Sequence, residues 1–221
     1  MTVIWDWNGT LLDDTDAALA AFNAQLVRRG LAPISRDFYR AHFAFPVKPF
    51  YELCGIDLAR EDWDALAREY HRSYAAEPKA LNRETLAALE RVRDSGARQC
   101  VLSALRQDLL ESALDACGIR GYFDFVYGVD NLDGASKLDR ARELLAHLEA
   151  EDPDFRTPGR VPAVLVGDAL HDKEVADALA LPCVLVATGG HAAVRLRAVA
   201  PTCDTLLEAV DLVLAGECPW A

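Results

Sequence analysis

Several features that would point to common protein classes are missing from this sequence of 221 residues. It contains no Cys-x-x-Cys pair, and its cysteines are scattered and do not cluster with histidines, which excludes the usual zinc motifs and a disulfide framework. We therefore expect reduced thiols in a cytoplasmic protein. The cysteines in question are Cys54, Cys100, Cys117, Cys183, Cys203 and Cys218.

Basic residues and long apolar runs are also scarce. Lys and Arg number 23 against 35 Asp and Glu, so the formal charge is −12, and the calculated pI is about 4.8. Nucleic-acid binders usually carry a basic surface, and acidic membranes attract one, so we expect neither partner. No apolar run approaches the roughly 18 residues of a membrane span, and no signal-peptide pattern is present. The expected partner is a small molecule, and the oligomeric state stays open.

Short apolar segments alternate with amphipathic ones, in a chain that is 52% hydrophobic. Runs rich in β-branched and aromatic residues, bounded by turn residues, are typical of buried strands. Their alternation with helical segments predicts an α/β fold, a doubly wound parallel sheet with helices on both faces. The predicted strands are 2–5, 99–103, 123–128, 162–168 and 182–187.

The alternation is interrupted once, after the first strand. Between residues 15 and 81 the sequence predicts helices and no strand, with Gly30 and Gly55 as helix stops. We interpret this stretch as an inserted helical domain on a core made of residues 1–14 and 82–221. The predicted helical segments are 16–30, 35–43, 48–55 and 60–74.

Polar residues follow three of the predicted strands. Asp6, Ser103 and Asp168 each stand at a strand end, where open parallel sheets bind their ligands. Lys137 lies at the start of a predicted helix and can reach the same rim. Two carboxylates, a hydroxyl and an ammonium suit a magnesium ion and a phosphate, with amides of the turn at Gly9 as further donors.

These residues fall in four short motifs, in this order: "DWNGT" (6–10), Ser103 in "VLSA", Lys137 in "SKLD", and "GDALHD" (167–172). With them, the sequence resembles the haloacid dehalogenase superfamily, and within it the small-molecule phosphatases similar to phosphoglycolate phosphatase. The resemblance spans nearly the whole chain, and the inserted helices correspond to the helical cap of the family. Four motifs in order are far more specific than any single one.

The resemblance implies a magnesium-dependent phosphohydrolase that acts on a small phosphorylated metabolite. Asp6 is the implied nucleophile, which forms an aspartyl-phosphate. Magnesium is expected on Asp6, the backbone carbonyl of Asn8, Asp168 and Asp172. The implied phosphate contacts are Gly9, Thr10, Ser103, Ala104 and Lys137. The cap is expected to close over the substrate and determine specificity.

Asn8 departs from the family pattern. Most phosphatases of this family carry a second Asp two residues after the nucleophile, where it serves as general acid and base. An amide transfers no proton near neutral pH. Three outcomes stay open: another acid or a water relay, substrates with good leaving groups, or a weakly active phosphate-binding or regulatory protein. The nearby replacements by sequence are Asp13, Asp14, His171 and Asp172.

A second activity is also compatible with Asn8. Phosphonoacetaldehyde hydrolases share the fold, lack the second Asp and use a cap lysine as a Schiff-base nucleophile. Lys48 lies in a cap segment that we expect to face the core, and it is the candidate for that role. Arg40, Lys48 and Tyr51 are alternatively cap contacts for an anionic substrate.

The sequence also predicts where two histidines and one tryptophan in or near the motifs lie. We expect His171 in a solvated loop and His191 on the surface. Trp7 either walls the site or contacts the cap.

Overall fold

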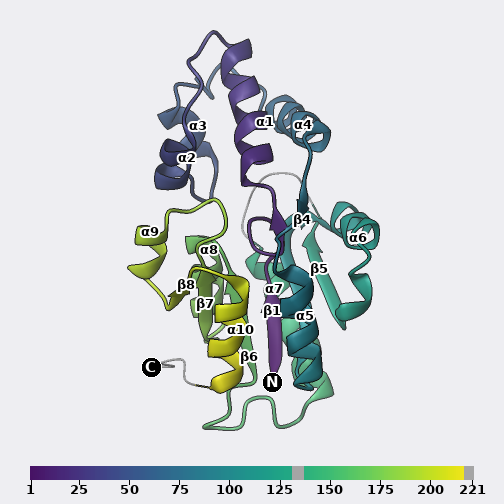
Figure 1. The fold of residues 1–221 in the computed structure, drawn as a ribbon. Coiled ribbons are helices and arrows are strands. Elements are labelled where there is room, and N and C mark those ends of the chain that lie inside the picture. Colours follow the sequence, from purple (N-terminus) through teal and green to yellow (C-terminus); the bar gives the residue numbers. More distant parts are fainter. Residues whose placement is uncertain (131–136, 217–221) are drawn as a thin grey trace.

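The structure is a computed structural model that describes residues 1–130 and 137–216. Its centre is a six-stranded parallel sheet with the strand order β5-β4-β1-β6-β7-β8. Figure 1 shows β1 rising from the N-terminus through the middle of the molecule. The strands of this sheet are β1 (Thr2–Trp5), β4 (Arg98–Arg106), β5 (Phe125–Val129), β6 (Ala163–Gly167), β7 (Cys183–Val186) and β8 (Thr202–Cys203).

Helices cover both faces of this sheet, which explains why its strands are continuous apolar runs. One face packs on α5 (Thr85–Asp94), α6 (Gln107–Ala116) and α10 (Leu206–Ala215). The other packs on α7 (Leu138–Glu151), α8 (Leu170–Ala178) and α9 (Ala193–Arg197). A short 3-10 helix, η1 (Arg120–Tyr122), precedes β5. The predicted α/β fold with a doubly wound parallel sheet is confirmed.

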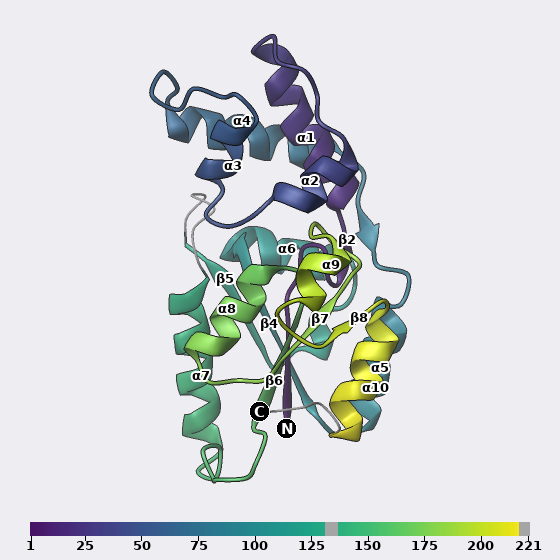
Figure 2. The ribbon, with the colours of Figure 1, turned by 90° about the vertical axis from the view of Figure 1, so that its left-hand side faces the viewer.

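Four further helices gather beyond the carboxyl ends of the strands (Figures 1 and 2). They bury a hydrophobic cluster of their own, built around Phe22, Leu26, Phe50 and Leu66, and we call them the cap. A two-stranded antiparallel ribbon of β2 (Leu12–Asp13) and β3 (Ala80–Leu81) lies where the chain enters and leaves them. The cap helices are α1 (Thr15–Arg28), α2 (Arg36–His42), α3 (Lys48–Leu53) and α4 (Trp63–Ala76).

The observed elements differ from the predicted ones where strands are very short. The strands β2, β3 and β8 hold two residues each, too few for a periodic pattern to reveal. In addition, β4 runs to Arg106, so Ser103 lies within the strand and not after it. Trp7 is fully buried in the core cluster and does not line the cavity described below, so the prediction that it walls the site is wrong.

The expectations about membrane spans and disulfides can be compared with the described residues only. Within 1–130 and 137–216, no helix is long and apolar enough to cross a membrane. The cysteines at 54, 100, 117, 183 and 203 form no disulfide. Cys218, also expected to be a reduced thiol, lies outside the described residues.

Candidate active site

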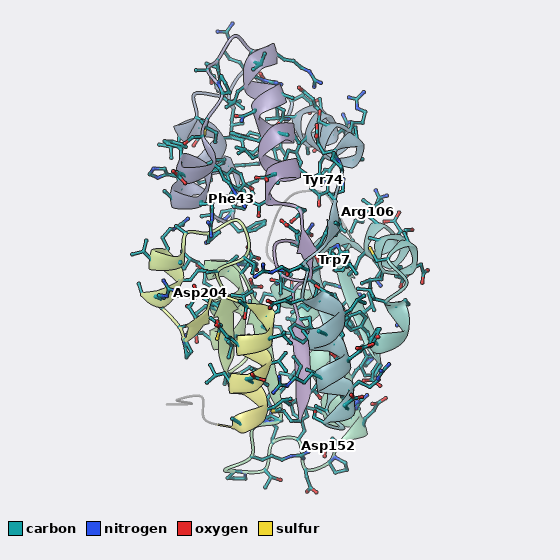
Figure 3. All side chains as sticks on the ribbon, viewed as in Figure 1. Trp7, Phe43, Tyr74, Arg106, Asp152 and Asp204 are labelled. Carbon is teal, nitrogen blue, oxygen red and sulfur yellow. The ribbon has the colours of Figure 1, made fainter. Side chains whose placement is uncertain are left out.

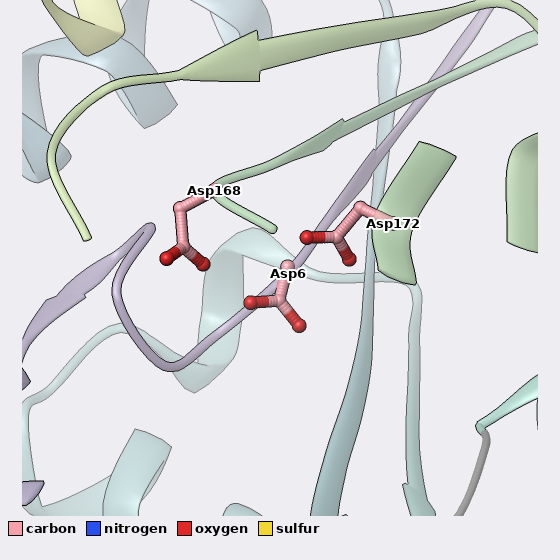
Figure 4. Close-up of side chains that lie close together, drawn as sticks. All are labelled: Asp6, Asp168 and Asp172. Atoms are coloured by element: carbon pink, nitrogen blue, oxygen red, sulfur yellow. The ribbon is translucent and has the colours of Figure 1, made fainter. Parts of the chain in front are cut away.

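Three carboxylates meet at the carboxyl edge of the sheet. Asp6 directly follows β1, Asp168 follows the adjacent strand β6, and Asp172 lies in the first turn of α8. One oxygen from each lies within 4.8 Å of the others, and all three residues are buried. Figure 4 shows the three side chains converging from separate elements. The predicted meeting of strand ends is therefore realised in the structure.

Lys137 provides the positive charge of this cluster from the start of α7. Its Nζ lies 2.5 Å from Asp6 Oδ1 and 2.6 Å from Asp172 Oδ1, and it donates to the Leu102 carbonyl at 3.1 Å. Two of these contacts, with Asp6 and Leu102, are hydrogen bonds, and the contact with Asp172 is an ion pair. Burial disfavours the ammonium, but Asp172 and Asp6 outweigh that effect and raise the pKa of Lys137. Lys137 is consequently charged at any physiological pH.

One ammonium does not balance three buried carboxylates. Burial raises the pKa of Asp6 against the opposing attraction of Lys137. Burial, and then repulsion from Asp6 and Asp172, raise the pKa of Asp168 well above its usual value. A divalent cation would remove this repulsion and keep the carboxylates ionised. Magnesium prefers oxygen ligands, so the residues present fit that ion.

The turn after Asp6 approaches Asp168 so closely that it tolerates no side chain. Gly9 has φ = +76°, and a Cβ there would lie 2.5 Å from Asp168 Oδ2. Across the site, a Cβ on Gly189 would lie only 1.9 Å from the same oxygen. The Gly190 amide donates to Asp168 Oδ2 at 2.8 Å, and the Thr10 hydroxyl donates to Oδ1 at 3.4 Å. Two glycines thus let the backbone enclose Asp168 and orient its carboxylate.

Asn8 belongs to a hydrogen-bonded group that joins core and cap. Its Nδ2 donates to Asp14 Oδ2 at 2.7 Å and to the Tyr74 hydroxyl at 2.9 Å. The Tyr74 hydroxyl donates to the same Asp14 oxygen at 2.5 Å, and the Gly9 amide donates to Asp14 Oδ1 at 2.8 Å. Asp14 accepts all three hydrogen bonds from these groups, although its burial raises its pKa. The amide at position 8 therefore donates a hydrogen bond that an ionised carboxylate at that position could not donate.

Of the other predicted phosphate contacts, Ser103 and Ala104 both line the space above Asp6. Ser103 is buried, and its Oγ accepts a hydrogen bond from the Leu105 amide at 3.0 Å. This contact leaves the hydroxyl hydrogen of Ser103 available to a ligand.

Both histidines near the site are buried, contrary to the expectation of solvated side chains. His171 lies in α8, not in a loop, and its Nε2 faces the Lys137 amide at 3.4 Å. Burial, and then Lys137, lower its pKa. His191 accepts a hydrogen bond from the Leu170 amide at 3.3 Å, and burial lowers its pKa to about 4. Apolar cap side chains cover both rings: Phe45 contacts His171, and Phe43 contacts His191.

The two basic cap candidates do not face the site. Lys48 is exposed, contrary to expectation, and its ammonium lies 4.8 Å from the centroid of the Trp63 ring. Arg40 instead ties the cap to the core, because its guanidinium donates to the carbonyls of Ala187 and His191 at 3.0 and 3.1 Å. Neither residue lines the cavity described below.

A cavity of about 200 Å³ separates the carboxylates from the cap. Its floor includes Asp6, Asp168 and Lys137, and its cap side is mostly aromatic. In Figure 3, Phe43 and Tyr74 lie at this junction between the two parts of the molecule. Tyr51, a predicted cap contact, does line the cavity. The aromatic residues that sequence reasoning did not assign to it are Phe22, Tyr39, Phe43, Phe45, Phe50, Trp63, Tyr70 and Tyr74.

The fold and this arrangement of residues define the class of the protein. The family model for haloacid dehalogenase-like hydrolases matches residues 3–186, and the chain belongs to that family. Curated relatives agree with a hydrolase of the phosphatase type, as predicted. The phosphoglycolate phosphatase of Caulobacter vibrioides is 27% identical over 195 residues, 85% of this chain and 79% of that protein. A probable phosphatase, IndB, of Dickeya dadantii is 26% identical over 216 residues, 94% of this chain and 91% of that protein.

Solved structures share the fold at lower identity. A predicted phosphatase from Clostridium acetobutylicum superposes with a TM-score of 0.75 at 18% identity, covering 97% of this chain and 98% of that one. The structure titled Protein Tyrosine Kinase A of Mycobacterium tuberculosis has a TM-score of 0.70 at 24% identity, covering 95% of this chain and 97% of that one. Since proteins named as a phosphatase and as a kinase share this fold, the reaction has to be argued from the site.

Proposed function

We propose that the protein is a magnesium-dependent phosphatase that hydrolyses a small phosphorylated metabolite through a phosphorylated Asp6. The observation that carries the proposal is the convergence of Asp6, Asp168, Asp172 and Lys137 at the carboxyl edge of the sheet. Four charged groups buried together cost free energy, and such clusters concentrate at functional sites.

The proposed reaction has two displacements at phosphorus. In the first, an oxygen of Asp6 forms a bond to phosphorus while the bond from phosphorus to the leaving oxygen breaks. In the second, water attacks the aspartyl-phosphate, releasing inorganic phosphate and restoring the Asp6 carboxylate. The hydrogen bond from the Asp6 amide to the Val166 carbonyl, at 2.8 Å, anchors the nucleophile to β6 during both steps.

The metal ligands we propose are the carboxylates of Asp6, Asp168 and Asp172 and the backbone carbonyl of Asn8. A bound magnesium ion supplies neutralising charge for the phosphoryl oxygens. Without that charge, the cluster of carboxylates repels a phosphate dianion. Asp168 is held in a fixed orientation, because two backbone segments enclose it.

Other side chains of the core orient the phosphoryl group. The Ser103 hydroxyl is a proposed donor. The Gly9 amide already donates to Asp14 Oδ1 at 2.8 Å and the Thr10 amide to the Trp7 carbonyl at 3.3 Å, so we do not propose these two predicted contacts.

Lys137 donates hydrogen bonds to Asp6 and to the Leu102 carbonyl and forms an ion pair with Asp172, so its first effect is to hold Asp6 in place. Its third hydrogen is the proposed donor to the phosphate.

The alternative of a Schiff base on Lys48 finds no support in the structure. Lys48 is exposed, lies against the Trp63 ring and does not line the cavity. A Schiff-base nucleophile has to reach the substrate carbonyl, so we do not propose carbon-phosphorus cleavage.

Phosphate release from a panel of metabolite phosphates tests the proposal. The panel includes phosphoglycolate, after the named relatives, together with acetyl and phenyl phosphate. We expect release with magnesium and none after chelation. Asp168→Asn should weaken magnesium binding in calorimetry at least about tenfold, because a ligand charge is lost. Turnover that survives chelation would contradict the proposal.

A further inference from the structure

The cap side of the cavity is suited to an aromatic ring. Tyr39, Phe50, Tyr51, Trp63 and Tyr70 line it from three helices. They pack on one another at the angles typical of aromatic clusters: Tyr51 and Trp63 have centroids 5.4 Å apart, inclined at 69°. An apolar cavity of about 150 Å³ is enough to bind benzene. The volume of about 200 Å³ found here includes the space over Asp6 as well as the aromatic side, so the room beside the phosphoryl group is that of a single six-membered ring.

The described residues of this wall include no Lys or Arg, and His71 is its histidine. Among the described residues, the only Lys and Arg side chains that line the cavity are Lys137 and Arg106, both from the core. Lys137 is paired with Asp6 and Asp172. Arg106 makes two hydrogen bonds to Asp108, at 2.6 and 2.7 Å. A substrate with a carboxylate next to its phosphate, such as phosphoglycolate, would bury that second charge against aromatic rings, which is costly.

Asn8 independently points to the same kind of substrate. It cannot protonate a leaving oxygen, and its amide is held by Asp14 and Tyr74. An alkoxide leaving group needs that proton, since alcohols are about as weakly acidic as water. A phenol has a pKa near 10, like the tyrosine side chain, so a phenolate leaves without help.

From these two observations, we propose that the substrate is an aryl phosphate monoester with one aromatic ring. This inference rests on the proposed phosphatase function and names its substrate class. The ring occupies the aromatic cavity of the cap, and the phosphoryl group lies over Asp6. When the Asp6 oxygen bonds to phosphorus, the bond from phosphorus to the aryl oxygen breaks, and its electron pair leaves on the phenolate. The phenolate takes its proton from solvent on release.

Binding can be measured apart from turnover with phosphonates, whose bond from carbon to phosphorus this reaction does not break. The probes are benzylphosphonate and phosphonoacetate, the latter a mimic of phosphoglycolate, each with magnesium and the wild-type protein. We expect benzylphosphonate to bind at least about tenfold more tightly by calorimetry, because it buries a ring in the cavity. Equal affinity, or tighter binding of phosphonoacetate, would overturn the proposal.

Kinetics separate the effect of the aromatic ring on binding from the effect of the leaving group on the reaction. We expect kcat/KM for phenyl phosphate to exceed that for phosphoglycolate at least about tenfold. Cyclohexyl phosphate carries a ring of similar size on an alcohol. It should compete with phenyl phosphate but have a kcat/KM at least about 100-fold lower, because no acid protonates its leaving oxygen. Equal kcat/KM for these two ring substrates, a ratio that does not depend on the later water step, would show that another group supplies the proton.

Variants of the cavity wall complete the test. Tyr51→Leu and Tyr70→Leu keep the wall apolar but remove the aromatic contact, and each should raise KM for phenyl phosphate about three- to tenfold. KM for phosphoglycolate should rise less in both variants. The matched control is Phe38→Leu, because Phe38 packs on the cap cluster but does not line the cavity. An unchanged KM for phenyl phosphate in both wall variants would contradict the assignment of the ring to the cavity.

Failure of this inference can be told from failure of the proposed function. If phosphoglycolate is the best substrate and needs magnesium and Asp6, the phosphatase function stands and the aryl assignment is wrong. If no ester or acyl phosphate in the panel releases phosphate, the proposed function itself is wrong.

Discussion

The core edge of the cavity and its cap wall contain opposite kinds of residues. The core edge holds buried charges, and each stands at a strand end or helix start. The cap wall holds aromatic side chains from helices that lie outside the four sequence motifs. Phosphoryl chemistry restricts the residue types and positions that work at the core edge, whereas many combinations of apolar side chains form a suitable wall. We infer that the core determines the reaction and the cap determines its substrate.

The largest effect should come from the core alone. Asp6→Asn removes the nucleophile, and phosphate release from every substrate should fall at least about 10,000-fold. The isosteric side chain keeps its packing, so circular dichroism should be unchanged. If the loss differed strongly between phenyl phosphate and phosphoglycolate, the inference that the core determines the reaction and the cap determines the substrate would be wrong.

A swap of two residues tests what the amide at position 8 does. Asn8→Asp alone sets two carboxylates at the 2.7 Å contact with Asp14 and should lower the free energy of unfolding by about 1–3 kcal/mol at pH 8. Asn8→Asp combined with Asp14→Asn restores one amide and one carboxylate. We expect this double variant to hydrolyse alkyl phosphates about 10- to 100-fold faster than the wild type, because position 8 gains a general acid. No gain would show that the wild type already has a proton donor.

The core also contains a pH-dependent contribution to stability, from His191. Burial lowers its folded pKa to about 4, below the usual value of 6.5 in an unfolded chain. Between these values the unfolded state binds more protons, so stability rises with pH and is lost as the pH falls. Lowering the pH from 7.5 to 5 should therefore lower the free energy of unfolding by about 2 kcal/mol.

The variant His191→Asn isolates this contribution. Asn keeps an acceptor for the Leu170 amide without titrating. Urea unfolding at the two pH values should show a smaller pH dependence in His191→Asn than in the wild type. An identical pH dependence would mean that another group is responsible.

The smallest effect concerns the contact between the two regions. Tyr74→Phe removes the hydroxyl that binds Asn8 and Asp14 and should lower the free energy of unfolding by about 1 kcal/mol, with KM raised for all substrates alike. Tyr122→Phe is the control, because its hydroxyl makes a long contact of 3.3 Å to Glu90 on the core surface. A loss confined to phenyl phosphate would place Tyr74 in the selective wall instead.

The sequence predicted the core edge well because strand ends are local features. Asp6 and Asp168 stand directly after buried apolar runs, so topology alone brings them together. Lys137 followed from its place at a helix start. Tyr74 could not be predicted, since it meets Asn8 across 66 positions through the packing of α4. The exposure of Lys48 and the burial of His171 and His191 also depend on how the cap sits on the core.

The most direct test of the proposed reaction is to trap the phosphorylated protein. The wild type is mixed with phenyl phosphate and magnesium, quenched in acid and mapped by mass spectrometry. Because Asn8 provides no base for the water step, we predict a burst of phenol close to one equivalent and a phosphoryl group on the peptide that contains Asp6. Phenol released steadily without a burst, from a protein that never carries a phosphoryl group on Asp6, would contradict the account.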